Sequence, residues 1–523
     1  MTLKNKYVLF ITLILGNIFF FFLSAYLLNM QYEENDDIIM CLIANGKFTG
    51  IPDCHLVFQN ALYGVIISSL YKLTNSIEWY SIAFVIIHIL SMSVIVYNIV
   101  LKCSYKPLLI AVLLSIYSIW CVIIQSFQFT TTAGILCIAG CIMLLSNSIP
   151  ALCLGYFAIF IASLIRFEVV VLVGLLFFPL IILTYKFDWK RYLYIIGVAF
   201  LVMTTKTTDR FFYQTAEWEH YRAYNALRGK INDNPNINVV DMDKIESVGI
   251  SERDYVMLCG FIIDPNTITL PILKQVVQIL RDVPLLDKIH NTQQLQRYRL
   301  PTICLFMLTI SLVCASKSKF IRIILIFWYI GFIILLGGLC LDHYLKNRVF
   351  LCAIMAMLAF LFIMFDKIPF NPWHSFVMIV CLLGISTKYF YQCYKVSNLK
   401  DSRANIWYEQ QKPLINNIPS NAYVLLSELN IEGISPFDIK SCQNKIYPTG
   451  WLTTIPLNRD IGHSLVDILN ENVYILSQNV DNIDGLINYL TTQYDINIAC
   501  NIITKNEYYS IIQLKNHHEH SLQ

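Results

Sequence analysis

The chain has 523 residues, of which 56% are hydrophobic and only 14% are charged, and its mean hydropathy is +0.57. Soluble globular proteins carry about 25% charged residues, so this composition excludes an ordinary soluble protein. The net charge of +3 is too small to indicate nucleic-acid binding. Apolar runs of spanning length recur along the chain, which predicts a helical membrane protein that crosses the bilayer many times.

About eleven apolar segments are predicted to span the membrane. They are residues 7–29, 79–101, 107–124, 131–147, 150–165, 168–185, 191–204, 300–316, 320–341, 347–365 and 370–390. The first segment follows Lys4 and Lys6 as a signal peptide would, but its length and the lack of a small-x-small cleavage site predict a retained anchor. The 16 cysteines are scattered without paired metal spacing, which indicates small buried side chains.

Basic residues in the short connections orient these segments. With the N-terminus in the cytoplasm, every short basic connection falls on the cytoplasmic side: Lys102 and Lys106, then Lys186, Lys190 and Arg191, then Lys317, Lys319 and Arg322, then Lys367. This orientation requires that residues 57–73 do not cross, and we interpret that short run as an interfacial or re-entrant helix. Richness in Ile, Asn, Lys and Tyr indicates an AT-rich bacterial genome, so the predicted location is the bacterial inner (plasma) membrane.

Three polar regions then lie outside the membrane on the opposite face. Residues 30–78 form a loop with an acidic cluster at its start, and residues 205–299 form a mostly helical loop with helix-like apolar spacing at 217–227 and 270–280. In residues 395–523, β-rich runs at 423–426, 473–476, 496–499 and 509–512 alternate with helix-like stretches at 402–417 and 482–493. The predicted fold is an all-α polytopic membrane module, 1–394, followed by a small extracytoplasmic α/β domain, 395–523.

The acidic cluster is Glu33-Glu34-Asn35-Asp36-Asp37, directly after the first span. Four carboxylates in five residues beside hydrocarbon are costly unless they face water, a cation or a substrate. A solvated acidic loop is the alternative. A carboxylate in a membrane-facing cleft can accept a proton from an acceptor hydroxyl, and a neighbour can bind a divalent cation. Asp36 and Asp37 are therefore the candidate catalytic residues and metal ligands, with Glu34 as a substrate contact.

Three further clusters on the predicted outer side supply substrate-binding candidates. His55 is a candidate ligand, proton carrier or phosphate contact, or else an interfacial histidine at a helix start. Arg166 and Glu168 either pair with each other or aim the arginine at a lipid phosphate. The segment from Asp342 to Arg348 carries three cationic candidates for a phosphate, which are otherwise snorkelling anchors: His343, Lys346 and Arg348.

Three polar or aromatic segments have weaker functional interpretations. Residues 125–132 and 217–222 fit a sugar site, but also an ordinary loop and an amphipathic surface helix, respectively. Residues 447–451 fit a turn with a packed Trp better than a sugar site. The chain has no nucleotide-binding Gly-rich loop and no His-Glu-x-x-His zinc motif.

The order of these features resembles the C-type (GT-C) membrane glycosyltransferases, which include protein O-mannosyltransferases and lipid A aminoarabinose transferases. The matching features are a first span, the Asp36-Asp37 pair at the start of a long outer loop, many further spans and a C-terminal extracytoplasmic α/β domain. The resemblance implies a polyprenyl-phosphate sugar donor and inverting transfer to a glycan or lipid acceptor. It also implies that Asp36 or Asp37 is the general base, with a divalent cation (Mg, Mn or Ca) as a possible cofactor.

Other functional classes remain open at this stage. A transporter of lipid-linked glycans would favour matched halves and charges within spans. An O-antigen-type polymerase or ligase would rely on arginine and histidine in outer loops and would not need the early acidic pair. A non-enzymatic scaffold would leave the acidic cluster as solvated surface.

Overall fold

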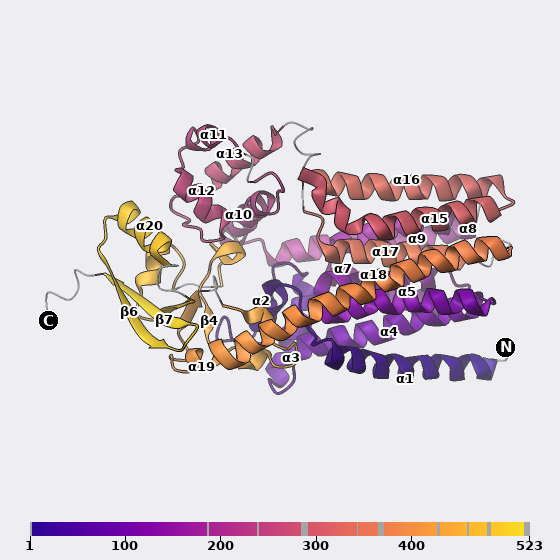
Figure 1. The fold of residues 1–523 in the computed structure, drawn as a ribbon, viewed down its shortest axis with the longest axis horizontal. Coiled ribbons are helices and arrows are strands. Elements are labelled where there is room, and N and C mark those ends of the chain that lie inside the picture. The colour runs from indigo at the N-terminus through magenta and orange to yellow at the C-terminus, as the bar shows by residue number, and fades with distance from the viewer. Residues whose placement is uncertain are drawn as a thin grey trace.

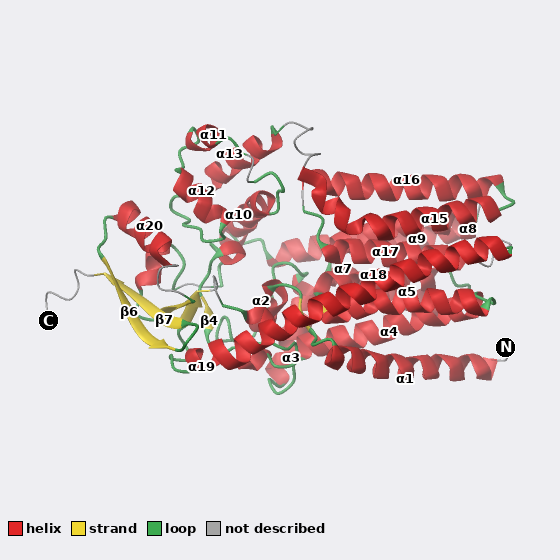
Figure 2. Ribbon diagram, in the orientation of Figure 1, coloured by secondary structure: helices red, strands yellow, loops and turns green. Residues whose placement is uncertain are grey.

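The fold was examined in a computed structural model, which describes residues 3–185, 188–237, 240–283, 291–342, 344–364, 371–425, 429–457, 460–478 and 483–516. Long helices run side by side in a bundle, and shorter helices and a small sheet lie at one end of it (Figure 2). The N-terminus lies at the opposite end of the bundle from the sheet (Figure 1). The connections between bundle helices at the end near the sheet lie close to the C-terminal region (Figure 1).

The bundle contains most of the long helices of the described chain. They are α1 (Leu3–Leu27), α4 (Trp79–Lys102), α5 (Lys106–Gln125), α6 (Phe129–Leu144), α7 (Ile149–Ile165), α8 (Phe167–Tyr185), α9 (Trp189–Phe212), α15 (Arg299–Ala315), α16 (Lys319–Asp342), α17 (Asn347–Ile363) and α18 (Pro372–Asn405). Each predicted span overlaps one of these helices. Within the described residues, 7 helices are long and apolar enough to cross a membrane: α1, α4, α5, α8, α15, α16 and α18.

The remaining four bundle helices leave the exact number of spans as a prediction. Helices α6, α7 and α17 are apolar but have only 16, 17 and 17 residues. Helix α9 has 24 residues but is not among the seven. The chain thus has the membrane-spanning character that its composition predicts.

Two short helices lie between α1 and α4. They are α2 (Asn35–Ala44) and α3 (Ala61–Leu73). The 13 residues of α3 extend about 20 Å at 1.5 Å per residue, less than the roughly 30 Å of a hydrocarbon core. Helix α3 packs against α4, α7 and α9, and whether it crosses the membrane stays a prediction.

The region after α9 is helical and has its own apolar core. Its elements are α10 (Ala216–Asn232), α11 (Met242–Glu246), α12 (Glu252–Cys259), α13 (Leu270–Arg281) and the 3-10 helix η1 (Asn291–Tyr298). The predicted helices at 217–227 and 270–280 correspond to α10 and α13. Side chains of Thr215 and Ser251 accept backbone N–H groups and so fix the starts of α10 and α12.

The C-terminal region contains a five-stranded mixed sheet. Its strands are β3 (Tyr423–Leu425), β4 (Lys445–Ile446), β5 (Val473–Ser477), β6 (Ile498–Lys505) and β7 (Ser510–Asn516), in the order β4-β3-β5-β7-β6. Strands β4 and β5 run parallel to β3, whereas β7 is antiparallel to β5 and β6. The predicted β-rich runs coincide with or adjoin β3, β5, β6 and β7, while β4 was not predicted.

Short helical elements complete this region. They are the π-helix η3 (Ile406–Gln411), α19 (Lys412–Ile415), α20 (Asp484–Tyr494) and the 3-10 helices η4 (Ile431–Gly433), η5 (Ile439–Ser441), η6 (Gly450–Leu452) and η7 (Leu465–Leu469). The predicted boundary at residues 394 and 395 lies inside the continuous 34-residue helix α18. The largest buried apolar cluster extends from the bundle to Trp407, Trp451 and Leu476, so the C-terminal region packs on the bundle.

The close packing of α3 on the loop that precedes it can be tested by substitution. A Cβ atom on Gly64 would lie 1.9 Å from the carbonyl oxygen of Cys54, whereas a Cβ atom on Gly174 of α8 would meet nothing within 4 Å. Gly64→Ala should therefore destabilise the protein by about 1–3 kcal/mol through overpacking. Gly174→Ala should keep or raise the melting temperature of the purified protein, and equal melting temperatures for the two variants would contradict the close contact.

Candidate functional site

The acidic cluster is held at the sheet end of the bundle by strand pairing. Strand β1 (Gln31–Tyr32) pairs in parallel with β2 (Ser126–Phe127). The backbone N–H of Glu33 then donates to the carbonyl oxygen of Phe127 at 3.0 Å. Helix α2 starts immediately afterwards, so both aspartates lie in its first turn, where a helix dipole stabilises carboxylates.

Asp37 is a buried structural residue in this arrangement. It is 0% exposed, and its Oδ1 accepts hydrogen bonds from the Tyr80 hydroxyl at 2.9 Å and the Phe129 backbone N–H at 3.2 Å. Its Oδ2 has no hydrogen-bond partner among the described residues. Burial, together with the charge of Asp36, raises the pKa of Asp37 well above its ordinary value. Its hydrogen bonds to Tyr80 and Phe129 tie α2 to α4 and to the start of α6.

A cavity of about 1150 Å³ lies next to this junction. Six of the predicted site residues line it: Glu34, Asp36, Arg166, Glu168, Lys346 and Arg348. Its walls come from the starts of α2, α8 and α17, the sheet-side end of α16, helix α10 and the segments around η4 and η6. Asp37 and His55 are not among the lining residues.

Asp36 presents a free carboxylate to this cavity. Its side chain is partly exposed and makes no hydrogen bond or ion pair with any residue that the structure describes. Burial away from bulk water, together with the charge of Glu34, raises the pKa of Asp36 to about 6. A carboxylate with this pKa and no partner can serve as a general base near neutral pH.

The two cations before and within α17 are paired with acids. Arg348 Nη1 lies 2.7 Å from Glu34 Oε2 and 3.7 Å from Glu33 Oε2. Lys346 Nζ lies 3.8 Å from Glu34 Oε1 and 3.4 Å from Asp233 Oδ1. Glu34 therefore bridges both cations, and the segment after α16 is joined to the acidic cluster.

Arg166 is also paired, as one of the sequence interpretations proposed. Its Nε lies 3.1 Å from Glu168 Oε2, and its Nη1 donates to the Phe58 carbonyl oxygen at 3.2 Å. Lys206 Nζ lies 3.1 Å from Glu168 Oε1. The guanidinium also packs over the Phe129 ring at 5.4 Å.

Several lining residues were missed by sequence reasoning. Helix α10 contributes Tyr221, Arg222, Asn225 and Arg228, and the C-terminal region contributes Glu432 and Trp451. The mixture of aromatic and charged residues at 217–222 was a signal for Tyr221 and Arg222, and residues 447–451 contained Trp451. Nothing local in the sequence distinguished Arg228 or Glu432.

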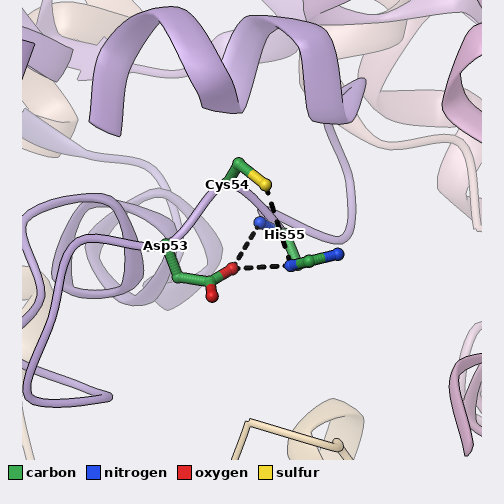
Figure 3. A group of neighbouring side chains, drawn as sticks. All are labelled: Asp53, Cys54 and His55. Atoms are coloured by element: carbon green, nitrogen blue, oxygen red, sulfur yellow. Dashed lines mark hydrogen bonds and ion pairs between the residues drawn. The ribbon is translucent and has the colours of Figure 1, made fainter. Parts of the chain in front are cut away.

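His55 lies outside the cavity lining in a separate group, Asp53-Cys54-His55 (Figure 3). Asp53 Oδ1 accepts hydrogen bonds from the backbone N–H and Nδ1 of His55, at 2.8 and 2.7 Å. The imidazole stacks on Trp218 with ring centroids 4.6 Å apart. Burial lowers the pKa of His55, but the bond to Asp53 outweighs it and raises the pKa to about 10. The residue thus anchors the loop before α3 to α10. His343 lies outside the described residues.

Comparisons with protein-family models, with curated proteins and with solved structures find no match for this chain. We therefore infer its function from the cavity itself.

The different surroundings of the two aspartates give a test of their roles. Asp37→Ala leaves the Tyr80 hydroxyl and the Phe129 N–H without their acceptor, which should cost about 1–3 kcal/mol of stability for each buried group. Asp36→Ala removes no hydrogen bond to a described residue and should change stability little. The melting temperatures of the two purified variants measure this difference, and a larger loss for Asp36→Ala would reverse the assignment.

Proposed function

We propose that the protein is a membrane glycosyltransferase that moves a sugar from a polyprenyl-phosphate donor to a glycan or lipid acceptor. The observation that carries the proposal is the combination of groups around one cavity. An unpaired carboxylate of raised pKa, Asp36, shares the cavity with cationic side chains that include Arg166, Arg228, Lys346 and Arg348. A base for a hydroxyl and cations for a phosphate are the two requirements of this reaction.

The apolar part of the wall supports a lipid-linked donor. Val171, Leu172 and Leu175 of α8 and Ile334, Leu335 and Leu339 of α16 line the cavity. Both helices are long and apolar enough to span a membrane. Leu175 and Ile334 are 57% and 67% exposed on the bundle surface, where hydrocarbon would surround them. A polyprenyl chain can lie against this wall while its phosphate reaches the polar part of the cavity.

The proposed reaction is a single displacement at the anomeric carbon. The acceptor hydroxyl oxygen forms the new bond to that carbon and loses its proton to the Asp36 carboxylate. The bond from the carbon to the phosphate oxygen breaks, and the polyprenyl phosphate leaves with the electron pair. Cationic side chains stabilise the charge that develops on the phosphate. Attack from the opposite face inverts the configuration.

A divalent cation has a limited donor set in this cavity. Carboxylate oxygens are the ligands that Mg²⁺ and Ca²⁺ prefer, but Glu34 and Glu168 are already engaged by Lys or Arg side chains. Asp233 is paired with Lys346, which leaves Asp36 and Glu432 as the lining carboxylates without an ion pair among the described residues. The proposed mechanism therefore assigns no step to a metal.

We assign the cavity to the outer face of a bacterial plasma membrane. The connections between α4 and α5 and between α15 and α16 lie at the same end of the bundle as the N-terminus (Figure 1). They carry Lys102, Lys106, Lys317 and Lys319, which the positive-inside rule places in the cytoplasm. The cavity and the sheet are at the other end, where lipid-linked sugars replace nucleotide sugars as donors.

Loss of the base should abolish transfer. Membranes with wild-type protein and a panel of radiolabelled polyprenyl-phosphate sugars should move label to glycan or lipid acceptors. Asp36→Asn should reduce this rate by about 10²–10⁴-fold, the usual contribution of a general base. Glu252→Gln, an exposed residue of α12 outside the cavity, is the control. Label that stays on the donor with folded wild-type protein would instead favour a polymerase, ligase or transporter.

The raised pKa of Asp36 sets the direction of the pH dependence. Below about pH 6 the carboxyl is protonated and cannot accept the proton of the acceptor, so kcat/KM should fall as the pH falls. The profile measured from pH 4.5 to 8 should rise through an apparent pKa of about 6 and then level. A rate that is flat across this interval would exclude Asp36 as the titrating base.

A further inference from the structure

The cations that line the cavity differ in how their charge is compensated. Arg166 is paired with Glu168, and Arg348 is paired with Glu33 and Glu34. Lys346 is paired with Glu34 and Asp233, and Arg222 with Asp209. Each of these side chains already has an acidic partner, so a phosphate would have to compete for it.

Arg228 is the exception among the described cations of the cavity. It is only 7% exposed, and its hydrogen bonds are to neutral amides: Nε donates to Asn225 Oδ1 at 3.0 Å and Nη1 to Asn232 Oδ1 at 3.1 Å. It forms no ion pair with any described residue, although its guanidinium carbon lies 6.0 Å from the centroid of the Phe261 ring and Asp36 and Asp233 act on it at longer range. A buried guanidinium without a counter-ion is destabilising, and burial lowers its pKa.

The geometry leaves donors for a ligand. A guanidinium has five N–H groups in a fixed fork, and the two amides engage its Nε and one N–H of Nη1. Because Asn225 and Asn232 lie one turn before and one turn after Arg228 on α10, they hold the guanidinium plane in place. Arg228 and its neighbour Gly229 both line the cavity, so the guanidinium borders the space that a ligand would occupy.

We propose that Arg228 is the anchor for the phosphate of the substrate. The fork that the amides leave free matches two oxygens of a phosphate, as in other bidentate arginine–phosphate contacts. The inference that this phosphate is linked to a lipid rests on the proposed function, whereas the inference of a phosphate site does not. In the transfer reaction Arg228 stabilises the departing phosphate, while Asp36 receives the proton of the attacking hydroxyl.

Arg222 is a matched control within the same helix. It lines the same cavity, but its Nη2 lies 3.3 Å from Asp209 Oδ2 and its guanidinium packs over Tyr213 at 4.8 Å. Its charge is already compensated. A general loss of positive potential would affect Arg222→Gln and Arg228→Gln similarly, whereas a specific anchor would not.

Binding to the full-length protein in lipid nanodiscs tests the proposal without sugar transfer. The probes are farnesyl phosphate, uncharged farnesol and inorganic phosphate. Farnesyl phosphate should bind wild type and Arg222→Gln with similar Kd values, and farnesol should bind both more weakly. Arg228→Gln should raise the Kd for farnesyl phosphate about tenfold or more, the usual effect of losing a charge-assisted hydrogen bond. Arg228→Lys should fall between wild type and Arg228→Gln, because lysine keeps the charge but not the fork.

Folding is checked by the melting temperature without ligand. Arg228→Gln loses no ion pair but loses donors to Asn225 and Asn232, so it should fold with a melting temperature close to that of wild type. If Arg228→Gln does not fold, Arg228→Lys, which keeps the charge, provides the comparison, and an unchanged Kd for farnesyl phosphate in Arg228→Lys would then overturn the bidentate contact. Equal Kd values for Arg228→Gln and wild type would overturn the proposal. If inorganic phosphate binds wild type as tightly as farnesyl phosphate does, and Arg228→Gln loses this binding, the site is a phosphate site. Its ligand would then be free phosphate rather than a lipid phosphate.

The outcomes separate this site from the proposed enzyme activity. One outcome is that Arg228→Gln loses farnesyl phosphate binding while wild-type protein transfers sugar from no donor. This outcome would support the phosphate site and reject the glycosyltransferase activity. Normal transfer by Arg228→Gln would reject the anchor and keep the enzyme.

Discussion

The hydrogen bond from the Phe129 backbone N–H to Asp37 fixes the direction of the acidic cluster. Together with the Tyr80 hydroxyl, it holds Asp37 in the interior, so the neighbouring Asp36 faces the cavity. The pairing of β1 with β2 directly before α2 fixes the same backbone. Lys400 of α18 adds to this junction, because its Nζ donates to the Tyr32 carbonyl oxygen at 3.1 Å. This contact ties α18, which leads into the C-terminal region, to the start of the acidic cluster.

Asp36 and Glu34 are two residues apart, yet their surroundings move their pKa values in opposite directions. Burial raises the pKa of Glu34, but Arg348 and Lys346 outweigh it and hold the pKa below its ordinary value. Glu34 therefore stays ionised as a counter-ion. Asp36 has no such partner, and its pKa is raised to about 6. Carboxylates with separated pKa values commonly have separate roles, and here one is a structural counter-ion and the other is available to react.

Helix positions could be predicted because they depend on local length and periodicity. The positions of α10, α13 and the bundle helices follow directly from apolar runs. The sequence predicted only part of the way in which the cavity residues come together. The predicted orientation brought the connections that carry Glu34, Arg166, Lys346 and Arg348 to one end of the bundle, but it did not predict that they line one cavity. The choice between Asp36 and Asp37 was not predictable, because it depends on Tyr80 and Phe129, which lie 43 and 92 residues from Asp37. Arg228 was missed for a similar reason, since its lack of a counter-ion is a property of the packed structure.

The lining of the cavity reaches only part of the way along the bundle helices. Along α8 its lining extends from Glu168 to Leu175, and along α16 it extends from Leu339 back to Ile334. At 1.5 Å per residue these stretches reach roughly 12 Å from the sheet-side ends of the two helices, less than half of the roughly 30 Å hydrocarbon core. A transport route would have to continue through the bundle, where α17 is buried from Phe350 to Ile363. A cavity that is polar at the helix ends and apolar for two turns below them fits the proposed lipid-linked substrate, which would enter and leave on one face.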